Sequence, residues 1–320
     1  MTRLQDVNTT DLTAAINLGC QAMQNVFNAD DHDMPFFEAN TWPYASMAFS
    51  PHLSECHVPG RHLNALLAAE AVTGVEIDPT AIERHRRAAF FSFSGPARLP
   101  LNRQEIDGPL VNFSPVNLRE GLHALYALVR YRHDTEAQAL AEAFFDEIHN
   151  YWSVTGGWAI ERLRALGLTF EPVQGSLNGE TRMLGPLVKY YRATGSPAAL
   201  RLALILGQDC LDKFFRPDGA YDHARFITDH THSITSSLSS LAQLGDLLDD
   251  DAILQRVKAF YDHGLWMMRD EIGWSPGAVF QHSDRGEANN PGDIVETALI
   301  LGRHGYPEND HGAASKGSPL

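Results

Sequence analysis

The stretch Asp229–Asp246, DHTHSITSSLSSLAQLGD, is the most informative part of this chain. It opens with His230, His232 and Ser233 and continues as a helix of small and apolar residues. The first N–H groups of a helix have no partner inside the helix, so a polar opening of this kind is suited to face a ligand. If similar helices stand side by side, their polar openings converge on one cavity. Similar openings begin the segments 112–128, 177–191 and 289–305, with a looser copy at 58–74.

A helical hairpin recurs along the chain with a period of roughly 55–60 residues. Each copy reads as a helix, a tight polar turn and a second helix. In repeats of this kind, neighbouring hairpins complete each other's core. The polar openings lie at the start of the first helix, so we predict an all-α (α/α) toroid with first helices inside and second helices outside. The copies are 124–144, 186–206 and 240–260, with turns at 133–136, 194–197 and 248–251.

The helices expected from this pattern cover most of the chain. Asp11 is the expected N-cap of the first. We expect one toroid domain over residues 1–306, followed by a flexible Gly/Ser/Pro-rich tail over 307–320. The apolar stripe at 294–301 then needs a cover, either from residues 1–28 or from a second subunit in a homo-oligomer. The expected helices are 12–27, 61–73, one opened by Pro79, 116–132, 135–152, 182–193, 197–215, 233–248, 251–270 and 293–304.

Charge and composition restrict the class of partner. The formal net charge of the 320 residues is −15, from 25 Lys+Arg and 40 Asp+Glu. Such a balance argues against nucleic acid and anionic membranes as partners, because both require basic patches. Three scattered cysteines and no apolar signal or membrane-spanning run predict a cytoplasmic protein.

Several segments resemble a known group of proteins: GRHLNALLAAEAVTG (60–74), YYRATGSPAALRLA (190–203), HTHSITSSLSSLAQL (230–244) and NNPGDIVETALILGRHGY (289–306). With them the chain resembles the (α/α)6-barrel carbohydrate-active proteins, among them unsaturated-glucuronyl hydrolases and β-L-arabinofuranosidase-like proteins. The resemblance implies a glycosidase acting on an oligosaccharide. The paired-cysteine zinc motif of the arabinofuranosidases is absent, so their cysteine-nucleophile mechanism is not carried over. About five inner helices are expected where the full barrel has six, so the ring is incomplete unless the N-terminal helix closes it.

Glycoside hydrolysis needs two carboxyl groups across a cleft. We take Glu180 and Asp293 as the acid/base pair, with Glu120 assisting. Each has an alternative interpretation: Asp293 as a helix cap, and Glu120 and Glu180 as first-turn charges that stabilise the helix dipole. Other carboxylates near the openings are Asp222, Asp229, Glu287 and Glu296.

The pair His230 and His232 suits proton transfer or hydrogen bonding to a substrate. A metal site would need further ligands, because an HxH pair alone is a weak signal. No metal or other cofactor is therefore expected. Histidine chemistry also keeps open a sugar epimerase or a polysaccharide lyase on the same architecture. A non-catalytic helical scaffold or carbohydrate-binding protein is the alternative from a different class.

The expected partner is an oligosaccharide or a sugar-derived small molecule. Arg61, Arg119 and Arg182 are candidates for holding a uronate, since guanidinium matches carboxylate geometry; the alternative is pairing with neighbouring glutamates. Trp274, in a Gly- and Pro-rich link, is the first candidate for stacking on a sugar ring. The other expected substrate-binding residues are His62, Asn117, Asn178, Tyr221 and Asn290.

Overall fold

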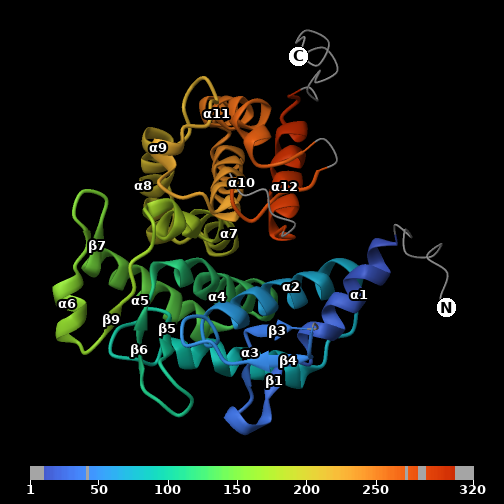
Figure 1. Ribbon diagram of the computed structural model, residues 1–320, viewed down its shortest axis with the longest axis vertical. Helices are drawn as coiled ribbons and strands as arrows, with labels where there is room; N and C mark the ends of the chain where they lie inside the picture. The colour runs from blue at the N-terminus through green and yellow to red at the C-terminus, as the bar shows by residue number, and fades with distance from the viewer. Residues whose placement is uncertain (1–10, 41–42, 271–272, 280–285, 307–320) are drawn as a thin grey trace. The chain divides into compact units, whose positions relative to one another are not determined.

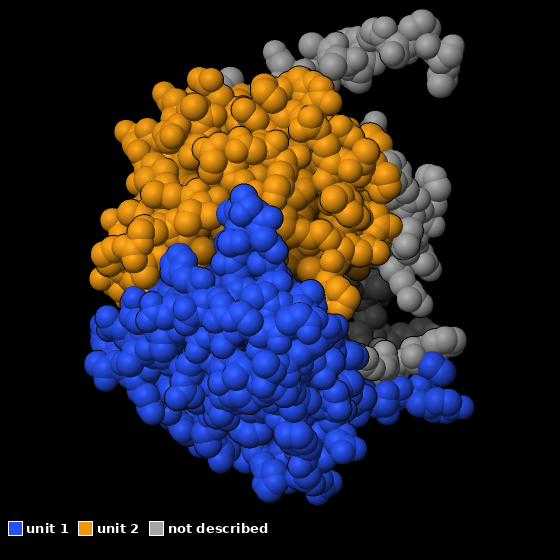
Figure 2. All heavy atoms as spheres, turned by 90° about the vertical axis from the view of Figure 1, so that its left-hand side faces the viewer, with its two compact units in different colours: residues 1–171 blue, residues 172–320 orange. Residues whose placement is uncertain are grey.

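A computed structural model describes residues 11–40, 43–270, 273–279 and 286–306 (Figure 1). Its contacts divide the chain into two compact units, residues 1–171 and 172–320, coloured separately in Figure 2. The tail predicted over 307–320 lies outside the described residues, and a single domain over 1–306 stays a prediction. In the described ranges, no helix has both the length and the apolar character needed to cross a bilayer.

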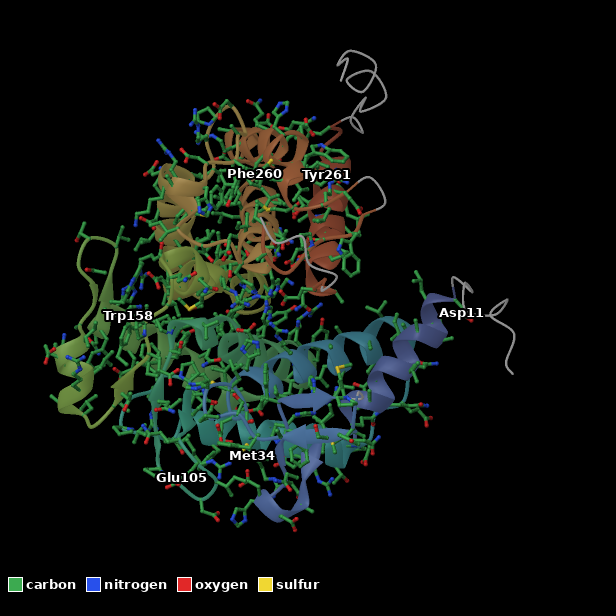
Figure 3. All side chains as sticks on the ribbon, in the orientation of Figure 1. Asp11, Met34, Glu105, Trp158, Phe260 and Tyr261 are labelled. Atoms are coloured by element: carbon green, nitrogen blue, oxygen red, sulfur yellow. The ribbon has the colours of Figure 1, made fainter. Side chains whose placement is uncertain are left out.

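The first unit is built around two helical hairpins. Helix α2 packs against α4, while α3 packs against α2 and α5 against α4, so each hairpin contributes one helix to the shared contact. Asp11 accepts a hydrogen bond from the Ala14 N–H and caps α1, as predicted (Figure 3). The helices are α1 (Leu12–Met23), α2 (His57–Thr73), α3 (Pro79–Ser92), α4 (Leu118–Arg132), α5 (Thr135–Tyr151) and α6 (Ile160–Ala165).

The strands of this unit are short and lie in the links between helices. Three antiparallel pairs are formed by β1 with β2, β3 with β4 and β7 with β8. In a three-stranded sheet, β6 lies between antiparallel β5 and parallel β9. The strands are β1 (Phe27–Asn28), β2 (Met34–Pro35), β3 (Glu38–Asn40), β4 (Ser46–Ala48), β5 (Leu101–Arg103), β6 (Leu110–Phe113), β7 (Trp152–Ser153), β8 (Gly157–Trp158) and β9 (Thr169–Phe170).

The second unit is organised around α10, which packs against α7, α12 and α11. Its residues from Thr231 to Gly245 are all buried. Five are serines. The hydroxyls of Ser236, Ser237 and Ser240 donate to carbonyls one turn back, whereas those of Ser233 and Ser239 donate to Asn178 and Glu296 on other elements. The elements are η4 (Ser176–Asn178), η5 (Glu180–Met183), α7 (Leu184–Thr194), α8 (Pro197–Lys213), α9 (His223–Phe226), α10 (Thr231–Leu248), α11 (Asp251–Asp262), η6 (Gly264–Met267) and α12 (Asn289–Arg303).

The three predicted hairpin turns are confirmed and share one design. The first helix ends at a residue in the left-handed region, and the next residue caps the second helix with its side chain. After α4 these are His133 and Asp134, and after α7 they are Gly195 and Ser196. After α10 they are Asp249 and Asp250. The turn chemistry is local, which is why the sequence predicts it.

Several helices differ from their expected bounds: α1 ends at Met23, and α12 begins at Asn289, so Asp293 lies inside α12 and does not cap it. Helix α11 ends at Asp262, and the chain continues as the short helix η6. Helix α2 begins at His57, several residues before the expected start, so Gly60 lies inside its first turn. There Gly60 packs against α4: a Cβ at this position would lie 1.8 Å from the carbonyl oxygen of Glu120. The absence of a side chain at Gly60 therefore permits the close approach of α2 and α4.

We expect Gly60→Ala to lower the free energy of unfolding by about 1–3 kcal/mol or more, because two backbones must separate. Urea denaturation followed by circular dichroism measures this. Gly19→Ala in α1 is the matched control, since its Cβ would meet no atom within 4 Å. That control should be neutral or raise stability by about 0.5–1 kcal/mol, because alanine favours a helix over glycine. Equal stabilities for the two variants would contradict the close contact.

Candidate functional site

A cluster of polar side chains lies at the N-terminal end of α10, in the second unit. His230 is the N-cap residue of this helix and has an extended backbone. It forms an isolated antiparallel bridge with Ala278, and the Thr231 N–H donates to the Gly277 carbonyl at 3.1 Å. These contacts hold the link before α12 against the start of α10.

Two carboxylates and two imidazoles alternate in this cluster. Nε2 of His230 lies 3.2 Å from Oε2 of Glu287, and Nδ1 of His232 lies 3.5 Å from Oε1 of the same side chain. On its other side, Nε2 of His232 lies 3.5 Å from Oδ2 of Asp293. The Thr235 hydroxyl donates to that same Oδ2 at 3.0 Å. The side chain of His232 is 1% exposed, whereas those of His230 and Glu287 are 36% and 30% exposed. The cluster therefore has a buried end and an accessible end.

A hydrogen-bonded chain orients His230. Its Nδ1 lies 2.8 Å from Oγ of Ser233, and that hydroxyl donates to Oδ1 of Asn178 at 2.7 Å. A serine hydroxyl has one proton, so the Ser233 oxygen accepts from the His230 Nδ1–H. Asn178, predicted as a substrate-binding residue, thus supports the histidine from η4.

The link between η6 and α12 forms another wall of the cluster. Asn290 is buried and donates from Nδ2 to the Ser275 hydroxyl at 3.1 Å and to the Pro276 carbonyl at 3.2 Å. Trp274 is 46% exposed and lies against Gly286, where a Cβ would come within 2.6 Å of its ring. Trp274 therefore belongs to the link that carries Glu287, and Asn290, in the first turn of α12, anchors that link. The exposed indole ring of Trp274 is accessible to a ligand.

Asp293 also faces open space. Together with α7 and α10, the α12 residues near it line a cavity of about 630 Å³. Sites for small molecules typically enclose roughly 300–1,000 Å³. The basic residues of this cavity are already paired: Lys189 lies 3.5 Å from Glu296, and Arg192 and Arg303 both contact Asp246.

Glu180 and Arg182 lie in η5, which packs against α10. Both are buried, with 8% and 1% of their surface exposed. Glu180 and Asp293 thus come from two elements that contact the same helix. The structure brings together four of the predicted residues: Asn178, His230, His232 and Asp293. Asn290 is connected to them indirectly, because it bonds to Ser275, whose carbonyl accepts from the Glu287 N–H.

Glu287 has a more central position than the sequence predicts, because the sequence indicates it only as one of several further carboxylates near the helix openings. It contacts both histidines, and Asn289 donates to its Oε1 at 3.1 Å. Its place depends on the path of the link after Trp274, which has no sequence period. One local signal was present: Glu287 lies two residues before α12, whose polar opening was recognised.

A separate polar cluster lies in the first unit, around Glu120. Its Oε1 is 3.1 Å from Arg119, 3.4 Å from Arg61 and 3.6 Å from Nε2 of His57. The Glu120 side chain is fully buried, and such a charge is stable only when paired. Asn117 contacts Nδ1 of His57 at 3.2 Å and donates to the His52 carbonyl. The alternative interpretation of Arg119, pairing with Glu120, is thus observed.

His62 and Tyr221 pack with other rings. His62 lies edge-on to His85, with ring centres 4.9 Å apart. Tyr221 stacks on Phe226, with ring centres 5.0 Å apart, and Phe226 in turn packs against the buried ring of Phe260. Burial, with the carboxylates of Asp229 and Asp222, raises the pKa of Tyr221. Both residues contribute packing in these positions.

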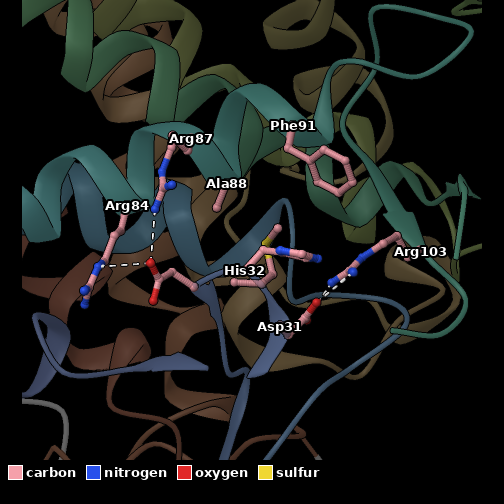
Figure 4. A pocket seen from close by; sticks show the side chains of 9 residues that line it. Asp31, His32, Arg84, Arg87, Ala88, Phe91 and Arg103 are labelled. Atoms are coloured by element: carbon pink, nitrogen blue, oxygen red, sulfur yellow. Dashed lines mark hydrogen bonds and ion pairs between the residues drawn. The ribbon is translucent and has the colours of Figure 1, made fainter. Parts of the chain in front are cut away.

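The pocket in Figure 4 lies in the first unit, between the β1–β2 hairpin and α3, and encloses about 300 Å³. Its charged residues are paired with one another. Arg84 and Arg87 lie 3.5 and 3.3 Å from Oδ2 of Asp33, and Arg103 forms a bidentate pair with Asp31. The pairs hold the hairpin onto α3 and β5.

No protein-family model and no curated protein matches the chain. Solved structures do match. The family 76 α-mannanase from Bacteroides thetaiotaomicron is 12% identical, with 91% of this chain and 83% of that one covered and a TM-score of 0.59. The α-1,6-mannanase from Salegentibacter sp. HEL1_6 is 10% identical, with 90% of this chain and 99% of that one covered and a TM-score of 0.56. The unsaturated glucuronyl hydrolase from Bacillus sp. GL1 is 14% identical, with 94% of this chain and 86% of that one covered and a TM-score of 0.54.

The chain has the all-α (α/α)-toroid fold. The predicted fold class and the resemblance to (α/α)6-barrel proteins are therefore confirmed. At identities of 10–14% the likeness concerns the fold.

The pair His62 and His85 makes stability depend on pH. Burial, with smaller contributions from His85 and Arg61, lowers the pKa of His62 from 6.5 to about 3. Burial lowers the pKa of His85 to about 4, although its hydrogen bond to the Met23 carbonyl has the opposite effect and raises the pKa. Below pH 6.5 the unfolded chain binds protons that the folded chain does not, so stability falls as the pH is lowered from about 6.5 towards 4.

We expect His62→Gln to reduce this loss of stability, because it removes one of the two groups. Urea denaturation at pH 7, 6 and 5 measures the dependence. The control is His32→Gln, since the side chain of His32 is 86% exposed. This variant should keep the wild-type dependence of stability on pH. The same slope in all three proteins would show that His62 is not responsible.

Proposed function

We propose that this protein is a carbohydrate-active enzyme that hydrolyses a glycosidic bond in an oligosaccharide, at the site formed by α10, α12 and η5. The fold supports a sugar substrate, because the mannanases and the glucuronyl hydrolase that share it are named for such reactions. The proposal takes its chemistry from the site itself, since one fold hosts many reactions.

The position of Asp293 carries the proposal. This carboxylate faces His232 and Thr235 on one side and lines the cavity of about 630 Å³ on the other. Hydrogen bonds donated to a carboxylate stabilise its ionised form. Asp293 is therefore suited to act as the base or nucleophile towards a sugar in the cavity.

Glu180 is proposed as the second carboxyl group, which protonates the leaving oxygen. It is buried in η5, which packs against α10 as α12 does, so the two carboxyl groups come from elements that contact the same helix. Trp274 supplies an exposed aromatic face against which a sugar ring can stack.

The test uses Asp293→Asn and Glu180→Gln, which keep side-chain size and remove the carboxylates. The substrates are α-mannooligosaccharides and oligosaccharides ending in an unsaturated glucuronyl residue. We expect the wild type to release reducing sugar, and each variant to lose at least about 100-fold in kcat while keeping its circular dichroism spectrum. Asp212→Asn, an exposed carboxylate on α8, is the matched control and should keep full activity.

Other outcomes would replace the proposal. An unsaturated, ultraviolet-absorbing product indicates a lyase, and an epimerised sugar without bond cleavage indicates an epimerase. Binding of sugar without any product indicates a carbohydrate-binding scaffold. Full activity in Asp293→Asn would refute the role of this residue.

A further inference from the structure

The arrangement of His230, His232 and Glu287 has an electrostatic requirement that the sugar chemistry leaves unexplained. Because His230 donates its Nδ1–H to Ser233, a neutral His230 presents the lone pair of Nε2 to Oε2 of Glu287, 3.2 Å away. When His232 directs Nε2–H towards Asp293, its Nδ1 lone pair likewise faces Oε1 of Glu287, 3.5 Å away. Electron pairs that face each other at these distances repel unless a cation lies between them.

We propose that this cation is a divalent transition-metal ion of the zinc type, bound by Nε2 of His230, Nδ1 of His232 and the carboxylate of Glu287. Ligand atoms of the three residues lie within 4.8 Å of one another. Metal–ligand distances of about 2.0–2.2 Å place tetrahedral ligands about 3.3–3.5 Å apart. The two measured separations, 3.2 Å from His230 to Oε2 and 3.5 Å from His232 to Oε1 of Glu287, are close to this spacing, so adjustments of the side chains would bring the three ligands around one ion.

The residues behind the three ligands match those of a metal centre. Histidines that bind metals usually donate their other N–H to a carboxylate or another acceptor, which fixes the ring and its tautomer. His230 does so to Ser233, which is held by Asn178. His232 faces Asp293, which accepts from Thr235. Asn289 donates to Glu287. Each of the three ligands thus has its own supporting group.

The choice of ion follows from the ligands. Two imidazole nitrogens and one carboxylate suit Zn²⁺, Co²⁺ or Fe²⁺, whereas Ca²⁺ and Mg²⁺ prefer oxygen ligands. With three protein ligands, at least one coordination position remains for water or a substrate oxygen. That position faces the accessible end of the cluster, because Glu287 and His230 are 30% and 36% exposed. The inference holds for any sugar reaction at this site.

The test is metal binding by the purified protein after removal of metals with a chelator. Zn²⁺ binding is measured by equilibrium dialysis with elemental analysis, and Co²⁺ is added as a visible-absorbing probe. We expect about one Zn²⁺ per chain in the wild type and a rise in the unfolding temperature on binding. His230→Gln and Glu287→Gln should each abolish stoichiometric binding.

Two further variants separate metal binding from misfolding. Ser233→Ala leaves all three ligands in place and should weaken binding about 10–100-fold, because the orienting hydrogen bond is lost. His304→Gln removes a histidine that faces a different carboxylate, Asp246, and should bind Zn²⁺ like the wild type. Circular dichroism of the stripped proteins verifies that each variant folds.

The inference is overturned if stripped wild-type protein binds no Zn²⁺, or if His230→Gln and Glu287→Gln bind as well as His304→Gln. A proton shared by the three side chains would then be the cation. The result is independent of the proposed hydrolysis, because Asp293→Asn can abolish turnover in a protein that still binds metal.

Discussion

The burial of α10 is the constraint on which the second unit depends. Helices α7, α11 and α12 pack against α10, and a stretch of fifteen residues, Thr231–Gly245, is buried. A buried helix of this kind is normally apolar all round. Here serine hydroxyls replace much of that apolar surface, and they can be buried because they bond to carbonyls of the helix itself or to side chains of η4 and α12. Small side chains also let neighbouring elements approach closely: Cβ on Gly185 of α7 would lie 2.7 Å from the Ser240 hydroxyl.

Burial at the start of this helix produces the chemistry of the site. The His232 side chain is 1% exposed, so its ring nitrogens face carboxylates of the protein and not water. His232 has one on each side, Glu287 and Asp293. The two belong to different segments, the link and α12. Packing of those segments onto α10 is therefore also what assembles the polar cluster.

The sequence predicted features that depend on neighbouring residues and missed those that depend on the path of a link. Each hairpin turn needs one left-handed residue and one capping side chain, and the pairs His133–Asp134 and Asp249–Asp250 supply both. The place of Glu287 depends instead on the bridges that tie the link to the start of α10, between residues distant in sequence. The packing of His62 is of the same kind, since its neighbour His85 comes from the next helix, and its role towards a substrate stays a prediction.

Helix openings that look alike in sequence serve different purposes in the structure. At α4, Glu120 is surrounded by Arg61, Arg119 and His57, so its charge is compensated within the protein. At α12, Asn290 anchors a link through two hydrogen bonds. At α10, the histidines face carboxylates whose side chains reach accessible space. A polar residue at a helix start thus indicates a position that can face a ligand, while its partners from other segments decide whether it does. Glu120 and His232 are both buried, but Glu120 is paired with two arginines, whereas His232 lies between two carboxylates.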